Sequence, residues 1–227
     1  MDLSLLKRLN KERRERRPVI LITNTNSGEQ HLYGPDDSVD DAALRDEVSA
    51  RFYSGKSGTV GDHFISVYLP SPRLVVIGAV HISQHLVSPA AAAGFDVTII
   101  DPRTAFASEE RFPDVALFAE WPDVILTGNP LDPFTALAAL THDPKIDDLP
   151  LSEGLKAGCF YVGALGSRKT HGKRVDRLKE RGHTEAEIDR INAPIGLDIG
   201  ASSPAEIAIA VLAEVIAARR NKLQEAA

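Results

Sequence analysis

Cysteine is nearly absent from the chain: Cys159 is the single one among 227 residues. A lone cysteine excludes an intramolecular disulfide and fits the reducing cytoplasm, where we expect the protein to work. Apolar runs are short, and none approaches the roughly 20 residues that span a bilayer. Charges from Lys7 onward interrupt the first segment, so we expect neither a membrane span nor a signal peptide. The formal net charge of −6 argues against a nucleic-acid-binding protein with a basic surface.

The composition that remains is typical of a globular protein, with 43% hydrophobic and 26% charged residues. Its length fits one large domain, or a core domain with a small appendage. We expect a small N-terminal α+β region over residues 1–70, ending at the turn sequence "PSP". Its expected elements are helices at "SLLKRLNKERRER" and "DDAALRDEVSARFYSG" and strands at "VILITNT" and "HFISVYLP".

Residues 73–227 follow a different rhythm, in which apolar runs alternate with helical patterns. "RLVVIGA", "FDVTIID" and "CFYVGA" are typical of strands buried on both faces. "FTALAAL" also predicts a strand, although its alanines suit a helix. "SQHLVSPAAAAG" predicts a helix that Pro89 can kink or interrupt. Such units in series predict an α/β fold with a Rossmann-like, doubly wound parallel sheet, whose ligands bind at the carboxyl ends of the strands.

Two helices near the end have clear start signals. Thr184 with Glu187 has the form of a capping box, and Ser203 with Glu206 repeats it, with Pro204 at the first helical position. The second of these helices carries an apolar stripe that we expect to pack against the sheet; its members are Ile207, Val211, Leu212, Val215 and Ile216.

The turn after the first strand of this region, "LVVIGAVHIS", has part of a dinucleotide-binding pattern. Asp101 lies 23 residues after Gly78, at the end of the next strand, where such sites place an acid. The second glycine of the pattern, which lets the backbone approach a pyrophosphate, is replaced by Val80, and Ser83 stands where the third glycine is usual. We therefore expect a Rossmann-like strand whose turn does not bind NAD tightly.

The next candidate turn is "THDPKID". His142 exchanges protons near neutral pH, and the adjacent Asp143 could tune it. Alternatively, Thr141 caps a short turn and Asp143-Pro144 starts a loop, and spacing alone favours this second interpretation.

The turn in "YVGALGSRKTHGK" is the strongest local signal. Gly163 and Gly166 permit backbone conformations closed to other residues, and Ser167 would open a helix whose N-terminus attracts anions. Arg168 and Lys169 add donors suited to phosphate or carboxylate. The alternative is an ordinary strand–helix turn with exposed cations.

In "PIGLDIGAS", Asp198 lies between two glycines in an apolar strip. It is exposed at a turn, bonded to backbone amides, or faces a ligand, because a buried unpaired carboxylate is costly. Cys159 is expected to be a small buried hydrophobe.

Several of these stretches together resemble the XdhC/CoxI family. They are "RLVVIGAVHIS", "VTIIDPR", "RFPDVALFAEWP", "ALTHDPKID", "YVGALGSRKTHGKRVDRLKERG" and "INAPIGLDIGASSPAEIAIAVLAEVIAAR". Members of that family are accessory factors of molybdenum hydroxylases such as xanthine dehydrogenase and carbon monoxide dehydrogenase. The resemblance implies a Rossmann-like C-terminal domain, a homodimer, and a chaperone more than a catalyst. It also implies binding of molybdenum cofactor, help with its sulfuration by a cysteine desulfurase, and delivery to the apo molybdenum hydroxylase.

Two departures from the family pattern matter. The turn that usually reads Gly-Ala-Gly-His has Val80 in its third place, and no cysteine precedes Arg73 where the family's N-terminal domain usually carries one. The short N-terminal region, truncated relative to that domain, looks more like the branch associated with carbon monoxide dehydrogenase maturation. The missing cysteine argues against thiol-based sulfur handling by this chain.

Chemistry and resemblance together predict a cofactor site at the carboxyl edge of the sheet, with no catalytic residue and no metal ligand assigned. The predicted cofactor-binding residues are Gly78, Ala79, His81, Asp101, Arg103, His142, Asp143, Gly166, Ser167, Arg168, Lys169 and Asp198. The turn at Gly166–Lys169 would hold phosphate or oxo groups, and Asp101, His142 or Asp198 would contact the pterin. The alternatives are an NAD(P)-dependent oxidoreductase on the same fold and a scaffold without a small-molecule ligand.

Overall fold

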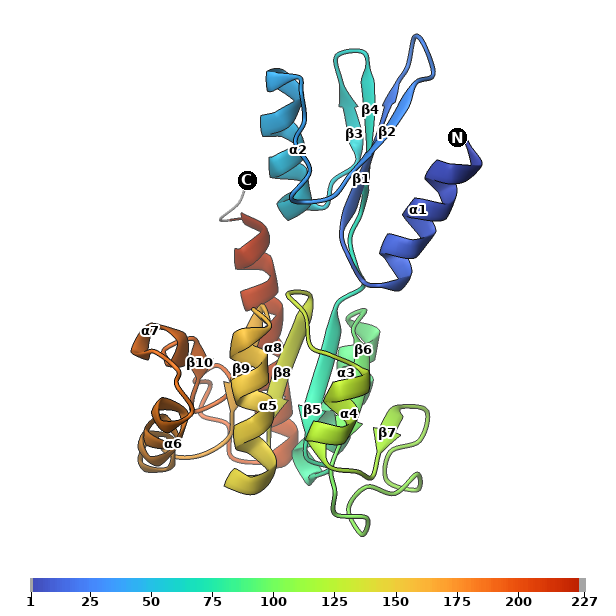
Figure 1. Ribbon diagram of the computed structural model, residues 1–227. Coiled ribbons are helices and arrows are strands. Elements are labelled where there is room, and N and C mark those ends of the chain that lie inside the picture. Colours follow the sequence, from blue (N-terminus) through green and yellow to red (C-terminus); the bar gives the residue numbers. More distant parts are fainter. Residues whose placement is uncertain (1, 225–227) are drawn as a thin grey trace. The chain divides into compact units, whose positions relative to one another are not determined.

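The computed structural model describes residues 2–224. The chain divides into two compact units: residues 1–70 together with the last residues from Arg220 onward, and Ser71–Arg219. Both combine helices with a sheet (Figure 1).

The smaller unit is built on a four-stranded antiparallel sheet of order β2-β1-β4-β3. Its elements are α1 (Leu3–Arg14), β1 (Val19–Asn24), β2 (Gln30–Tyr33), α2 (Ala42–Ser54), β3 (Gly58–Val60) and β4 (His63–Tyr68). Alternate residues of β1 face opposite sides of the sheet. Ile20 and Ile22 pack with Val48 of α2, whereas Val19 and Leu21 pack with Leu9 of α1. The two predicted helices and two predicted strands are confirmed, and the short strands β2 and β3 are additional.

The larger unit contains a six-stranded, fully parallel sheet of order β10-β9-β8-β5-β6-β7, which confirms the predicted fold class. The strands are β5 (Arg73–Ile77), β6 (Asp96–Ile100), β7 (Ala116–Phe118), β8 (Thr135–Ala139), β9 (Tyr161–Ala164) and β10 (Ile191–Asn192). The helices are α3 (His81–Ala92), α4 (Pro122–Gly128), α5 (Pro144–Lys156), α6 (Arg168–Glu180), α7 (Glu185–Ile188) and α8 (Pro204–Gln224).

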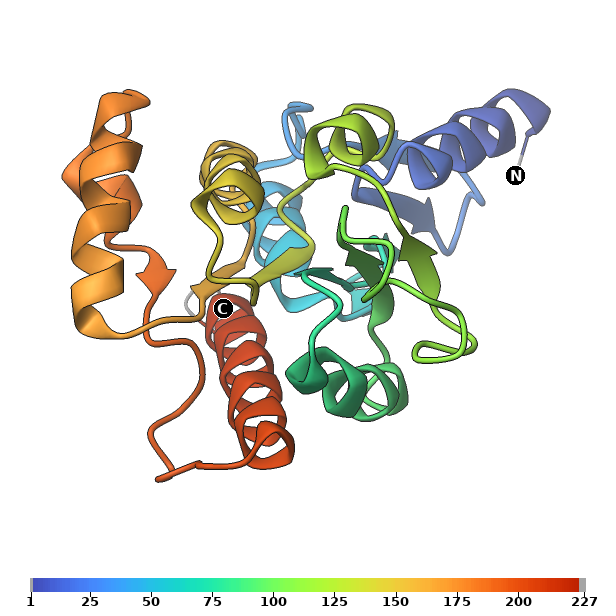
Figure 2. The same ribbon diagram turned by 90° about the horizontal axis from the view of Figure 1, so that it is seen from below.

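Helices cover both faces of this sheet, with α3 and α8 on one side and α4 and α5 on the other (Figure 2). The central strand β5 shows why: Leu74 and Val76 pack into the core on the α3 and α8 side. Val75 and Ile77 pack into the core that α5 and α6 complete. All four side chains are buried, as the continuous apolar run predicts.

Most of the predicted helix signals are confirmed. Both arms of the capping box at Thr184 and Glu187 form, and the Ser203 hydroxyl accepts from the Glu206 amide at 3.3 Å. Pro89 lies inside α3 without ending it. The apolar stripe on α8 is right for Val211 and Val215, which are buried. It is wrong for Ile216, which is 37% exposed.

Candidate functional site

The order of the strands places a topological switch point between β5 and β8. From β5 the chain builds outward through β6 to β7, then returns to the other side of β5 and builds outward again through β8, β9 and β10. In open sheets of this kind, ligands bind in the crevice outside the carboxyl ends of the strands at the reversal. The turns that follow β5 and β8 are therefore the first place to look for a site.

The turns after β5 and β8 touch each other through Gly78. This glycine has φ +115°, and a Cβ atom at this position would lie 2.7 Å from Thr141 Cγ2. Both the backbone conformation and the close approach require glycine here. The first glycine of the sequence pattern thus serves contact between two turns of the protein.

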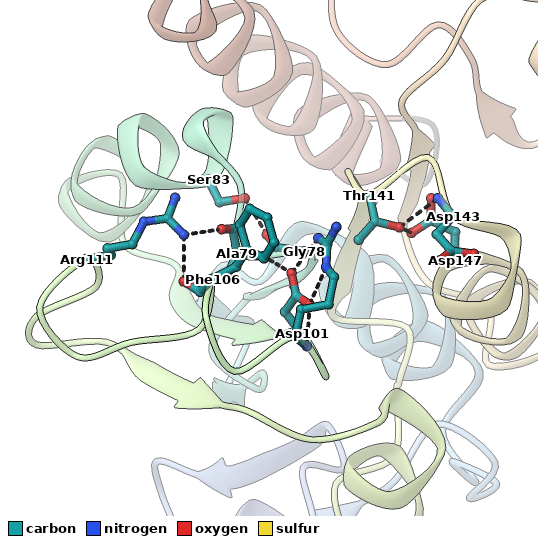
Figure 3. Close-up of polar contacts among 10 residues, drawn as sticks. Gly78, Ala79, Ser83, Asp101, Phe106, Arg111, Thr141, Asp143 and Asp147 are labelled. Carbon is teal, nitrogen blue, oxygen red and sulfur yellow. Dashed lines mark hydrogen bonds and ion pairs between the residues drawn. The ribbon is translucent and has the colours of Figure 1, made fainter.

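Asp101, directly after β6, ties the β5–α3 turn to its own loop (Figure 3). Its Oδ2 accepts from the Ala79 amide at 2.8 Å and from Arg103 Nη2 at 2.7 Å. Its Oδ1 accepts from the Arg103 amide and from Arg103 Nε, both at 2.9 Å. The carboxylate is fully buried. Burial acts to raise the pKa of Asp101, but the hydrogen bonds from Arg103 and Ala79 outweigh it and hold that pKa below its usual value.

The remaining backbone groups of the turn also have partners within the protein. The Gly78 amide donates to the Ile100 carbonyl at 2.8 Å, and the Gly78 carbonyl accepts from the Ser83 hydroxyl at 2.5 Å. The Ala79 carbonyl accepts from Arg111 Nη1 at 2.9 Å (Figure 3). All four backbone polar groups of Gly78 and Ala79 are thus engaged internally. Asp101 and this turn are built as a structural clasp, which we call the Asp101 clasp.

The turn after β8 is organised by Thr141. Its hydroxyl accepts from the Asp143 amide at 3.0 Å and donates to Asp147 Oδ1 at 2.6 Å (Figure 3). Asp143 is the N-cap of α5, with Pro144 in the first turn, so this pair starts a helix and the prediction that it starts a loop was wrong. Between them, His142 is exposed and adopts φ +65°, a conformation that residues other than glycine seldom occupy.

The turn after β9 closes against the turn after β8. Gly166 has φ +133°, and a Cβ atom there would lie 3.2 Å from Thr170 and 3.7 Å from His142 Nδ1. Ser167 caps α6 as predicted, accepting from the Thr170 amide at 3.3 Å. Glycine is required at position 163 for a reason other than the predicted backbone conformation. Its φ is not positive, but a Cβ atom would lie 2.5 Å from Tyr161 Oη, so close packing demands glycine.

A cavity of about 280 Å³ lies where the β8–α5 turn meets α6. It is lined by His142, Pro144, Asp147, Asp148, Lys169, Thr170, Lys173, Arg174 and Arg177. Four of these side chains are lysine or arginine, and all four come from α6. We refer to this cavity as the α5–α6 cavity.

Two pairs of acidic and basic side chains at the α5–α6 cavity differ in how they are satisfied. Arg177 donates to both oxygens of Asp148, at 2.5 and 3.0 Å, which is a complete bidentate pair. Arg174 and Asp147 are 2% and 1% exposed, yet Arg174 Nε and Nη1 and Asp147 Oδ2 have no hydrogen-bond partner. Burial raises the pKa of Asp147 to about 6, against the opposing effect of its bond to Thr141.

The structure brings some of the predicted site residues together and separates others. His142 and Lys169 line the α5–α6 cavity, with Gly166 behind His142. Ser167 and Arg168 are exposed at the start of α6. His81 is exposed at the start of α3, on the switch-point side of the sheet. Asp198 is exposed in the loop before α8, where the neighbouring Leu197 amide donates to Ala210 of that helix.

Two residues of the α5–α6 cavity were not predicted from the sequence, Asp147 and Arg174. Helical spacing carried a signal for Arg174, because it precedes the buried Leu178 by four residues and so shares its inward face. Asp147 had the same signal, because it precedes the buried Leu151 of α5 by four residues. The Lys/Arg-rich sequence of α6 is typical of a solvent-exposed helix face, and only the structure shows that Arg174 lies on the buried side.

Membrane spans and metal sites are two further features to consider. Within residues 2–224, no helix is long and apolar enough to cross a membrane. Over the same described residues, no group of three or more His, Cys, Asp or Glu side chains is arranged to hold a metal ion. Cys159 is buried in the core on the α5 and α6 side of the larger sheet, as expected for a small hydrophobe.

Comparison with known proteins finds relatives that match 70% of this chain. YqeB of Escherichia coli (strain K12), an uncharacterized protein, is 34% identical over 162 residues, which are 70% of this chain and 29% of that protein. A protein of Bacillus subtilis (strain 168) named as a probable subunit of xanthine dehydrogenase is 32% identical over 70% of this chain and 46% of its own length. The molybdenum cofactor insertion chaperone PaoD of Escherichia coli (strain K12) is 32% identical over 70% of this chain and 43% of its own. The matches thus span less than half of each relative.

The fold has a counterpart among solved structures. A crystal structure described as a xanthine dehydrogenase from Bacillus halodurans matches 99% of this chain and 70% of its own, with a TM-score of 0.69 and 23% identity. At that identity the likeness concerns the fold. The family model described as the XdhC Rossmann domain matches residues 74–215. Since this match covers more than half of the chain and nearly all of the larger unit, the chain belongs to the XdhC family.

Proposed function

We propose that this chain is a maturation factor that binds molybdenum cofactor as its cargo and assists insertion of that cargo into an apo molybdenum hydroxylase of the xanthine dehydrogenase or carbon monoxide dehydrogenase type. Relatives named as a molybdenum cofactor insertion chaperone and as a probable subunit of xanthine dehydrogenase support a role in maturation. The observation that carries the proposal is the α5–α6 cavity, because it joins a basic wall to unpartnered buried donors beside the switch point.

The chemistry of the cavity fits the cargo. Molybdenum cofactor is a pterin with a phosphate at one end and a dithiolene-bound metal oxide, so it presents anionic oxygens. Lys169, Lys173 and Arg174 supply cationic donors for such groups, and His142 stands exposed at the same wall. A volume of about 280 Å³ lies just below the range of pockets that enclose a whole organic ligand. The cavity therefore holds one end of the cargo, and the remainder extends along the carboxyl edge of the sheet.

The Asp101 clasp favours this proposal over a nicotinamide-dependent oxidoreductase. In dinucleotide sites the acid at the end of the second strand accepts from a ribose hydroxyl. Here the corresponding carboxylate already accepts four hydrogen bonds from Ala79 and Arg103. Val80 adds a branched side chain where a glycine would admit a pyrophosphate.

Sulfuration of the cargo, where it occurs, would draw its sulfur from a cysteine desulfurase acting on the bound cofactor. Cys159 is 1% exposed in the core, which argues against a persulfide carried by that thiol. In this scheme the chain retains and presents the cofactor, and its partner supplies the sulfur. A homodimer remains part of the proposal through the family alone.

The test is retention of cargo by the purified chain. The protein is incubated anaerobically with molybdenum cofactor, or separately with NAD(H) or NADP(H), then desalted and assayed for pterin, metal and nucleotide. We expect pterin and metal near one per chain and no nucleotide. Lys169→Ala with Lys173→Ala should reduce retention. Lys179→Ala with Arg181→Ala, in the last turn and at the C-cap of the same helix and outside the cavity, should not. Retention of nucleotide alone, or of nothing, would contradict the proposal.

Delivery is tested separately with an apo-hydroxylase as acceptor. We expect enzyme activity to appear faster from cofactor bound to this chain than from the same amount of free cofactor. Equal rates would leave binding intact and remove the delivery role.

A further inference from the structure

The α5–α6 cavity is lined by a buried guanidinium with one engaged nitrogen and two unpartnered ones. Arg174 Nη2 donates to the Leu165 carbonyl at 3.0 Å, which fixes the plane of the group against the end of β9. Nε and Nη1, which together carry three N–H donors, have no partner. Because buried donors are almost always satisfied in native proteins, unpartnered donors of a residue that lines a cavity point to a ligand that completes them.

Asp147 faces the same cavity and is also incomplete. Thr141 donates to Oδ1, while Oδ2 is buried without a partner. Neither Arg174 nor Asp147 uses the other as a hydrogen-bond partner, although the charge of each acts on the other. The neighbouring Arg177–Asp148 pair shows that the same two helices can form a closed bidentate bond. The open arrangement at Arg174 and Asp147 is therefore a local property of these two residues.

The geometry points to a seat for a tetrahedral dianion, such as a phosphate monoester or a free oxyanion, in which the unpartnered N–H groups of Arg174 and a protonated Asp147 both donate to the ligand. Guanidinium N–H groups bind phosphate-like oxygens through charge-assisted hydrogen bonds. A carboxyl group facing a dianion can contribute only when protonated, because its ionised form is an acceptor without a donor. Lys169 and Lys173 add positive charge at the wall. This inference deepens the proposed function, since a phosphate ester is one end of the proposed cargo.

Binding at this seat should be linked to proton uptake. Burial already raises the pKa of Asp147 to about 6, so in the protein without ligand this carboxyl group is mostly ionised at neutral pH. An anion that requires the protonated form should bind about tenfold more weakly for each pH unit above that value. The charges of Arg174 and Arg103 act on Asp147. The other basic or titratable side chains that line the cavity with it are His142 from its own turn and Lys169, Lys173 and Arg177 from α6. Asp148 is neutralised by Arg177.

Sulfate is the probe for the pH dependence, because it stays a dianion across the range and does not titrate itself. Its dissociation constant is measured by calorimetry on the full chain between about pH 5 and pH 8, against sodium chloride at equal ionic strength. We expect saturable binding that weakens as the pH rises. Absence of binding beyond the chloride control would overturn the inference.

Two variants separate the roles of the residues. Arg174→Lys keeps the charge and removes the planar fork, and should weaken sulfate binding by about ten- to a hundredfold. Arg181→Lys, an exposed arginine on the C-terminal end of the same helix, should bind like the wild type. Asp147→Asn keeps an oxygen for Thr141 and places a permanent donor at the other position, so its sulfate affinity should not change with pH.

His142→Gln is the control for the other lining side chain of a type that exchanges protons near neutral pH. If that variant loses the pH dependence while Asp147→Asn keeps it, the assignment to Asp147 is wrong. Equal affinity of wild type and Arg174→Lys would refute the seat altogether, and normal chain folding is checked by the fluorescence of Trp121.

The source of the oxyanion is distinguished by competition. Glycerol phosphate that displaces sulfate better than inorganic phosphate does indicates a seat for a phosphate monoester, and the reverse order indicates a seat for a free oxyanion. Sulfate binding that persists in a chain that retains no molybdenum cofactor would refute the proposed function and support this seat.

Discussion

Replacing Asp101 with asparagine should destabilise the larger unit by about 2–4 kcal/mol. Asparagine keeps one acceptor oxygen and replaces the other with an amide donor. Two of the four hydrogen bonds that Asp101 accepts from Ala79 and Arg103 are therefore lost, and their donors face another donor. Hydrogen bonds to charged groups contribute about 1.5–3 kcal/mol each. The side chain of Arg103 is 34% exposed, so water replaces part of the hydrogen bonding that it loses. The expected loss of stability is therefore smaller than the sum of two such bonds.

The assay is urea unfolding followed by tryptophan fluorescence. Trp121 is the single tryptophan of the chain and lies in the larger unit, so its signal reports on the unit that contains Asp101. Asp96→Asn is the matched control, because Asp96 is exposed at the other end of the same strand and its replacement should change stability by no more than about 0.5 kcal/mol. An Asp101→Asn variant as stable as the control would refute the structural role of the clasp.

The pH dependence of the same measurement gives a second check. The folded-state pKa of Asp101 lies below its unfolded value of about 3.9. The stabilisation is therefore fully present above the unfolded value and is lost as the pH falls through the folded one. The difference in stability between wild type and Asp101→Asn should narrow over that acidic range. A difference that stayed constant down to the acid transition would show that ionisation of Asp101 does not contribute.

Four further substitutions test other parts of the larger unit. Gly163→Ala should cost about 1–3 kcal/mol in urea unfolding, because its Cβ would lie 2.5 Å from Tyr161 Oη, whereas Gly172→Ala in open space on α6 should stabilise by about 0.5–1 kcal/mol. Val80→Gly restores the second glycine of the turn, yet equilibrium dialysis should detect no NAD binding while Asp101 stays engaged; micromolar binding would contradict the clasp. Thr184→Ala should cost about 1 kcal/mol through loss of the capping box, and a loss below about 0.3 kcal/mol would show that this cap is not needed.

Local sequence patterns were sufficient for the elements that are long and buried. The strands β5, β6 and β9 are mostly apolar and rich in β-branched or aromatic residues, so their composition marks them, whereas the alanines of β8 suit a helix as well. The edge strands β7 and β10 have three and two residues and no such signature. Their pairing depends on neighbours already in place, which a single sequence does not display.

The positions of the turns at the carboxyl edge were predictable, but the contacts of their side chains were not. The spacing of Gly78 and Asp101 located the first turn correctly, because spacing reflects the length of a strand–helix–strand unit. It could not reveal that Ala79 and Arg103 would occupy the carboxylate, since that depends on side-chain orientation in three dimensions. Arg174 and Asp147 lie on two different helices, and only the packing of α5 against α6 makes their open atoms neighbours of one cavity.

The short edge strands also constrain how copies of this protein can associate. A sheet grows by adding a strand to an exposed edge, and long flat edges are the usual templates for such growth. The larger sheet ends in β7 and β10, which offer only three and two residues of regular backbone. A homodimer formed through the larger unit would therefore have to use its helix and loop surfaces, and this sheet would stay closed to extension when the folded chain is concentrated.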